Sequence, residues 1–230
     1  SSDLEDKKVA FTRTTLAVVL AASLFAMPAT AKTRNEVLAE VEAGCAANAS
    51  GCAAILEAAI EEMVAAGANL GALATFTATM VERATEAVVA AGGSVASVAS
   101  VAKAAVASTG KIKEAAAAKG VFGVTAKADV AAAKSVAVAA KSAQKAAEST
   151  GASAASVSRA ISDVASSAAT TMSANAAKSM EAVATAAASG TLSIEAVTDA
   201  AETASAATET AATSAPDAPV APVIDASTNG

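Results

Sequence analysis

Apolar residues recur at helical spacing through most of the chain, between short breaks rich in Gly, Asn and Ser. In the clearest example, residues 52–66, apolar positions lie three and four residues apart and glutamates fall on the opposite side. The pattern predicts amphipathic helices over residues 32–43, 52–66, 70–91, 95–108, 111–119, 126–148, 154–188 and 194–213. The glycine breaks are unevenly spaced and carry no repeated motif, which favours successive helical hairpins over a repeat family.

Three boundaries in this prediction depend on breaker residues. We expect Gly44 to Gly51 to form a turn and Thr109-Gly110 to end a helix, because Gly, Asn and Thr favour helix ends. The stretch Ser166 to Asn175 is rich in Ser, Thr and Asn, whose side chains compete for backbone hydrogen bonds. A kink is therefore expected within the helix 154–188.

A secretory leader is predicted at residues 1–31. Three basic residues precede an apolar run over residues 16–27, and Pro28 breaks that run. Ala29 and Ala31 then provide the small residues that a signal peptidase accepts, so cleavage is expected before Lys32. The run is shorter than the roughly 20 residues of a membrane span. The protein is therefore expected to be exported, periplasmic or extracellular; the alternative is an uncleaved leader helix that acts as an anchor.

The mature chain, 32–230, is expected to contain an acidic helical segment with the Cys-flanked turn (32–91) and an Ala-rich helical region with a basic middle and an acidic end (92–213). Three prolines after residue 214 predict a disordered tail over 214–230. Ala makes up 67 of these 199 residues, whereas Leu, Ile, Val and Phe together make up 34. Since Ala is the best helix former, the predicted fold class is all-α, a succession of helical hairpins or a loose bundle with a thin core.

Cys45 and Cys52 are predicted to form a disulfide. In one continuous helix their Cα atoms would lie about 10.5 Å apart along the axis, beyond the roughly 7 Å that a bridge allows. The helix must therefore break between them, and Gly44, Asn48, Ser50 and Gly51 are suitable breakers. An exported compartment favours oxidation. An intermolecular bridge is the main alternative, and two isolated cysteines are a poor metal site.

The residue types argue against catalysis. The chain contains no His, Trp or Tyr, so it lacks the usual proton shuttle near neutral pH and the aromatic platforms that bind sugars or single-stranded nucleic acid. A Ser activated by Lys is a remote alternative. We therefore predict a non-enzymatic protein with no catalytic residues, cofactor, metal or small-molecule substrate, and no nucleic acid partner.

Charge is arranged in blocks. The net charge is −5 over residues 32–86, +6 over 103–145 and −7 over 148–230, within a chain of net charge −6. The favoured interpretation is that the basic middle packs against its acidic flanks. In the alternative, an anionic surface such as lipid headgroups is contacted by eight lysines, Lys103, Lys111, Lys113, Lys119, Lys127, Lys134, Lys141 and Lys145.

Lys127, Lys134 and Lys141 also repeat every seven residues, and a predicted seam recurs between them: Val130, Ala133, Ala137, Ala140 and Gln144. This spacing resembles a heptad with Ala in its seam and is typical of closely packed antiparallel helices. Two functions follow as hypotheses. The first is an exported structural or interaction protein that associates with itself or with another helical protein through Ala-rich helices. The second is a membrane-active protein whose amphipathic helices bind anionic lipid.

Overall fold

A computed structural model describes residues 32–121, 123–191 and 193–213. By its internal contacts the chain divides into two units, Ser1–Lys32 and Thr33–Gly230, and the helices described below belong to the second. The predicted leader, with Ala29 and Ala31, and the predicted tail 214–230 lie outside the described residues. Lys32, the expected first residue of the mature chain, is exposed.

The fold class is all-α, as predicted: the described residues form eight helices and no strand. The helices are α1 Arg34–Ala47, α2 Cys52–Ala65, α3 Leu70–Ala90, α4 Val95–Ala118, α5 Val124–Thr150, α6 Ala154–Thr171, α7 Ala174–Ala188 and α8 Ile194–Thr213. Several start where a polar side chain accepts a hydrogen bond from the first turn, as Thr33, Asn69 and Ser94 do. Within the described ranges, no helix combines the length and apolar character needed to cross a membrane.

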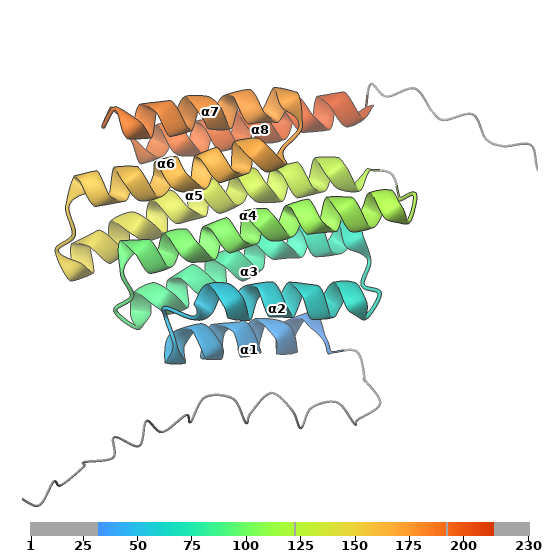
Figure 1. Cartoon of the computed structure of the whole chain (residues 1–230), viewed down its shortest axis with the longest axis horizontal. Helices are drawn as coiled ribbons and strands as arrows, with labels where there is room; N and C mark the ends of the chain where they lie inside the picture. The colour runs from blue at the N-terminus through green and yellow to red at the C-terminus, as the bar shows by residue number, and fades with distance from the viewer. Residues whose placement is uncertain (1–31, 122, 192, 214–230) are drawn as a thin grey trace, which may run out of the picture. The chain divides into compact units, whose positions relative to one another are not determined.

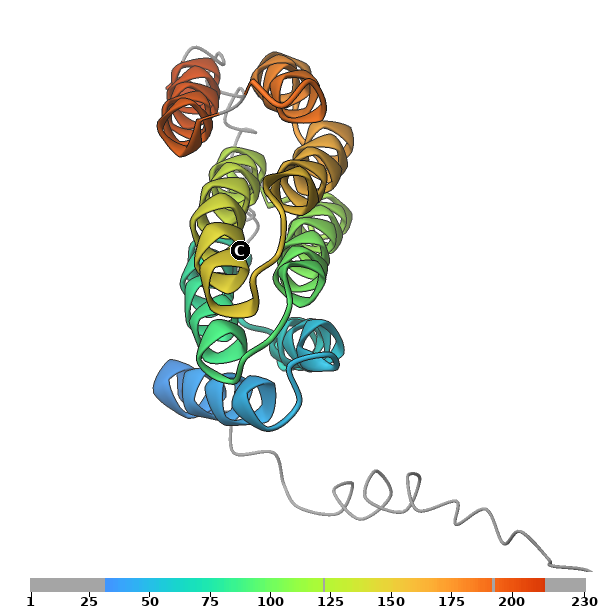
Figure 2. The same cartoon turned by 90° about the vertical axis from the view of Figure 1, so that its left-hand side faces the viewer.

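The helices of the second unit pack in two layers (Figures 1 and 2). One layer contains α1, α3, α5 and α8, and the other contains α2, α4, α6 and α7. Up to α6 the chain alternates between the layers at every turn. After α6 it stays in the same layer, because α7 packs beside α6, and only α8 returns to pack beside α5. Helix α5 therefore has four neighbours: α3 and α8 in its own layer, and α4 and α6 in the other.

Three predicted boundaries are wrong. Helix α4 continues through Thr109 and Gly110 to Ala118, so the helix expected to begin at residue 111 is the second half of α4. The helix expected over 154–188 is two helices, with a reversal rather than a kink at Met172 and Ser173, whose backbones are extended. Helix α1 includes Gly44 and ends at Ala47, so the turn between the cysteines is shorter than expected.

The core consists of a few large side chains among many alanines. The largest fully buried side chains include Leu56, Ile60, Leu73, Met80, Ile112 and Met180. Helix α5 instead packs mainly through small residues, and its alanines 128, 132, 133 and 140 have no exposed surface. Small side chains let neighbouring backbones approach closely, so other helices can pack near the α5 backbone.

Candidate functional site

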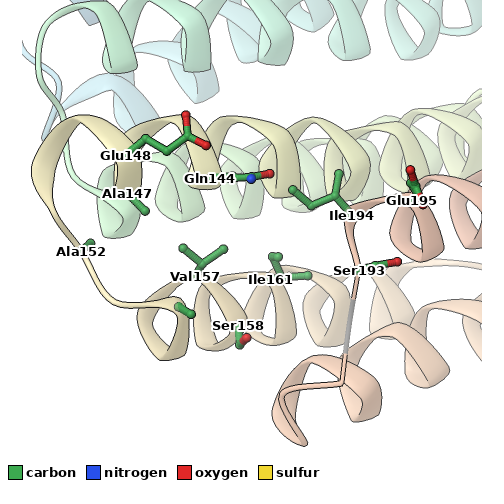
Figure 3. Close-up of a pocket in the computed structure, with 11 residues that line it drawn as sticks. Gln144, Ala147, Glu148, Ala152, Val157, Ser158, Ile161, Ser193, Ile194 and Glu195 are labelled. Atoms are coloured by element: carbon green, nitrogen blue, oxygen red, sulfur yellow. The ribbon is translucent and has the colours of Figure 1, made fainter.

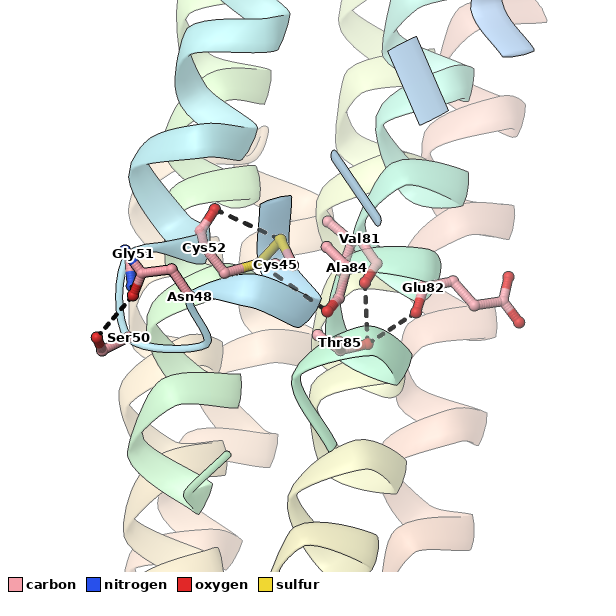
Figure 4. Close-up of a disulfide and its surroundings, with 9 residues drawn as sticks. All are labelled: Cys45, Asn48, Ser50, Gly51, Cys52, Val81, Glu82, Ala84 and Thr85. Atoms are coloured by element: carbon pink, nitrogen blue, oxygen red, sulfur yellow. Dashed lines mark hydrogen bonds between the residues drawn. A yellow bond between two sulfur atoms is a disulfide. The ribbon is translucent and has the colours of Figure 1, made fainter. Parts of the chain in front are cut away.

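The predicted disulfide is present, and it joins the end of α1 to the start of α2 (Figure 4). The Cα atoms of Cys45 and Cys52 are 4.5 Å apart, and both residues are fully buried. The Cys52 Sγ atom lies 3.9 Å from the carbonyl oxygen of Ala84 on α3. The bridge therefore ties the first helical hairpin together where that hairpin packs on the next.

Asn48 organises the turn inside the disulfide loop (Figure 4). Its side-chain oxygen Oδ1 accepts hydrogen bonds from the backbone N–H of Gly51 and the hydroxyl of Ser50, both at 3.0 Å. The helix is therefore interrupted by the segment from Asn48 to Gly51. Gly44, by contrast, is helical and lies against the Ile55 side chain. This turn brings the two cysteines within bonding distance.

A buried ion pair links three parts of the chain at the α6–α7 reversal. Lys113 Nζ on α4 donates to Asp129 Oδ1 on α5 at 2.8 Å and also to the carbonyl oxygen of Thr171. Asp129 Oδ2 accepts a hydrogen bond from the backbone N–H of Ser173, at 3.1 Å. The Asp129 side chain is 1% exposed and that of Lys113 is 19% exposed. The pair therefore holds the reversal against α4 and α5, and Lys113 points inward.

The structure distributes the eight candidate lysines over both layers. Lys103, Lys111, Lys113 and Lys119 belong to α4 or its C-terminal cap, in one layer; Lys127, Lys134, Lys141 and Lys145 belong to α5, in the other. All except Lys113 are exposed. Because each of these helices is covered by the opposite layer, their exposed sides face away from each other (Figure 2). A surface that lies flat against one layer therefore contacts the lysines of one of these helices.

Lys111 is paired across the surface of its layer. Its Nζ donates to Glu61 Oε1 on α2 at 2.6 Å, and both side chains are about half exposed. The hydrogen bond to Glu61 raises the pKa of Lys111, against a smaller opposing effect of burial. An exposed pair of this kind contributes little to stability, but it favours the observed pairing of α2 with α4.

The predicted small-residue seam of α5 is largely covered by the chain's own helices. Ala133 and Ala140 are fully buried, Val130 and Ala137 are half-buried, and Gln144 is exposed. On the described residues, the exposed large hydrophobic side chains are limited to Val121, in the loop after α4. The alanine seams are therefore used within one copy of the chain.

A charge pattern that the sequence analysis missed matches α8 to α5. Lys134 and Glu202 line one groove between the two helices, with a volume of about 360 Å³. The helices are antiparallel, because Gln144 and Glu195 line a second groove further along. Counting seven residues along each antiparallel helix from Lys134 and Glu202 leads to Lys141 and Glu195. The glutamates of α8, at 195, 202 and 209, repeat every seven residues, as the α5 lysines do.

The second groove lies where α5, α6 and the start of α8 meet (Figure 3). It has a volume of about 610 Å³, and Val157, Ile161 and Ile194 line it with apolar surface, while Glu148 and Glu195 stand at its sides. Together the two grooves follow the contact of α8 with its neighbours.

The arrangement of charged and apolar groups points to helix–helix contacts. In the described part of the chain, no three His, Cys, Asp or Glu side chains lie close enough together to hold a metal ion. The buried hydroxyls of Ser108, Ser135 and Thr77 donate to carbonyl oxygens of their own helices. The α5–α8 seam, where Lys134 and Glu202 line a groove, is the candidate interaction site. No protein-family model, curated protein or solved structure matches this chain.

Proposed function

We propose that this protein is an exported, non-enzymatic scaffold that associates with itself or with another helical protein through its Ala-rich helices. The observation that carries the proposal is the packing of α5, which runs for 27 residues and contacts four other helices through small side chains. Such a seam accepts a helix on close approach and selects it by shape and by flanking charge.

Two features support the exported location. The leader pattern at residues 1–31 is one. The other is the disulfide between Cys45 and Cys52, since disulfides persist chiefly in oxidising compartments. The absence of His from the sequence supports a non-enzymatic role.

A membrane-active function is the second candidate, and the exposed α5 lysines favour it. Lys127, Lys134 and Lys141 stand seven residues apart on one helix, about 10.5 Å from each other along the axis. If these lysines bind lipid, the α4 lysines, which belong to the opposite layer, do not contact it. With Lys145, which is also on α5, lipid binding would involve four of the eight predicted contacts.

Circular dichroism and light scattering of residues 32–230, with and without vesicles containing anionic lipid, separate the two functions. The scaffold predicts strong helicity in buffer, a mass above that of the monomer at micromolar concentration, and little change on adding vesicles. A chain that is unfolded in buffer and becomes helical only on vesicles would refute the scaffold and support the membrane-active function. A helical monomer whose helicity and mass do not change on adding vesicles would refute both functions.

A further inference from the structure

Helix α8 is the terminal helix with the weakest apolar attachment. Its buried apolar residues among the described side chains are Val197, Ala201 and Ala204, and Ile194 packs half-buried against the core. Helix α3, of similar length, buries twelve residues, including Leu73, Phe76 and Met80. Since burial contributes in proportion to apolar area, α8 is held by less hydrophobic free energy than the central helices.

The other terminal helix, α1, is attached differently. It also buries few large residues, but its disulfide to α2 fixes it covalently. Helix α8 has no such link and follows α7 through the short segment 189–193. The backbone N–H groups of Ser189, Gly190 and Thr191 donate to carbonyl oxygens of α7, so these three residues form the cap of α7.

The surface under α8 is selective for it. Lys134 on α5 lines a groove with Glu202 on α8, and the seven-residue spacing along the two antiparallel helices carries Lys141 toward Glu195. Among the described residues, none of these four side chains forms an ion pair within 4 Å, and the grooves beside them remain open. The charges therefore attract α8 to α5 in one register without locking it, as flanking charges do in coiled coils.

We propose that α8 is an exchangeable arm: α8 of one copy leaves its own α5 and packs on the α5 of a second copy, while the second copy's α8 does the same in return. In both the monomer and the dimer, the α5 seam is then covered by the same acidic helix, α8. This inference rests on the proposed self-association and specifies its surface, because the seams of α5 are otherwise covered within each copy. Exchange of an identical element is a low-cost route to a dimer.

Two charge-reversed variants test the exchange. One carries Lys134→Glu and Lys141→Glu on α5, and the other carries Glu195→Lys and Glu202→Lys on α8. In either variant alone, arm and seam repel each other both within and between copies. In a mixture, each arm is complementary to the seam of the other variant. Sedimentation velocity and native mass spectrometry of residues 32–230 then report the species formed.

We expect dimer in the wild type, at least a tenfold loss of dimer in each variant alone, and a 1:1 heterodimer on mixing. The chain with all four substitutions should associate as the wild type does, and its circular dichroism controls for folding. A matched control, Lys103→Glu with Lys119→Glu on the opposite layer, should leave the dimer unchanged.

Two results would overturn the exchange while leaving self-association intact: a wild-type dimer that persists in both variants, or variants that stay separate on mixing. A wild type that is monomeric throughout the micromolar range would instead refute the self-association itself, and the exchange with it.

Discussion

Replacement of Asp129 by Ala tests whether the α6–α7 reversal depends on a long-range ion pair. The substitution removes the carboxylate that accepts from Lys113 Nζ and from the backbone N–H of Ser173. The lysine is then left with the Thr171 carbonyl oxygen as its described partner, in a site where 19% of its side chain is exposed. The first turn of α7 also loses a negatively charged acceptor, which favours a helix N-terminus.

The expected cost follows from burial. Removing one partner of a buried ion pair destabilises a protein by about 3 to 5 kcal/mol, because the remaining charge is uncompensated. Partial exposure of Lys113 allows some hydration and favours the lower end of that range. An unsatisfied N–H at Ser173 adds about 1 kcal/mol. We therefore expect the free energy of unfolding to fall by about 3 to 4 kcal/mol.

Urea denaturation of residues 32–230, followed by circular dichroism, measures this change. For a protein of this size, about 3 kcal/mol corresponds to a fall in Tm of roughly 6 to 12 °C. The double variant Lys113→Met with Asp129→Leu should recover most of the loss, since an apolar pair leaves no buried charge. Lys103→Met, on the exposed side of α4, is the control and should change stability by less than about 0.5 kcal/mol. A loss below about 1 kcal/mol in Asp129→Ala would refute the reasoning.

Four further predictions concern local features. Replacing both Cys45 and Cys52 by Ala should lower stability by about 2 to 3 kcal/mol in the chain-entropy model. Non-reducing peptide mapping of the wild type should find the two cysteines joined to each other, and free thiols in the oxidised protein would contradict this. Gly93→Ala should lower stability by about 2 to 3 kcal/mol, because the new Cβ would lie 2.4 Å from Val88 Cγ1 and 2.7 Å from the Val88 carbonyl oxygen. Gly92→Ala has open space around the new Cβ but a φ of +74°, and should cost about 1 kcal/mol. Equal melting temperatures of the two variants would contradict this prediction. Ala140→Leu should lower stability by about 1 to 3 kcal/mol, because Ala140 is fully buried and a larger side chain overpacks the core. Ala137→Leu should be nearly neutral, because Ala137 faces the groove. Denaturation midpoints in the reverse order would contradict the observed packing of α5. Intact mass of the exported protein should correspond to a chain that begins at Lys32, and retention of residues 16–27 would indicate an anchor.

Features set by neighbours in the sequence were predictable. The turn between Cys45 and Cys52 depends on Asn48 and Gly51, and the bridge follows from their spacing. Likewise, Ser193 stands directly before the last apolar-periodic run, where Ser favours a helix cap, and its hydroxyl accepts from the N–H of Ala196 at 3.1 Å. In each case the sequence carries the cause within a few residues, so a local pattern is sufficient to predict the structure.

Thr109 and Gly110 show why local breakers can mislead. The Thr109 hydroxyl donates to the carbonyl oxygen of Val106, inside its own helix, instead of capping a new one. A Cβ at Gly110 would lie 3.6 Å from Thr171 Cγ2, so α4 passes close to the end of α6 at this point. Tertiary packing therefore overrides the weak preference of Thr and Gly for helix ends.

The reversal at Met172 and Ser173 depends on a residue far away in the sequence. The polar stretch around it was visible, but Asp129, which accepts from Ser173, lies 44 residues earlier. The charge match between α5 and α8 likewise depends on residues that are far apart in the sequence. The glutamates at intervals of seven are evident in the sequence once the lysines are noticed, yet nothing local indicates that these two helices are neighbours.

The alanine content that permits this fold also restricts how copies can associate. Small side chains let helices pack closely, but each alanine contributes little area, so a seam stabilises the chain only when helices cover it along its length. In α5 that cover comes from four helices of the same copy. A second copy can therefore reach the seam only by replacing one of them. Of the two terminal helices, α1 is held by a disulfide, whereas Val197 is the one fully buried apolar residue larger than alanine among the described side chains of α8. If the protein self-associates through its alanine seams, α8 is the helix that must move.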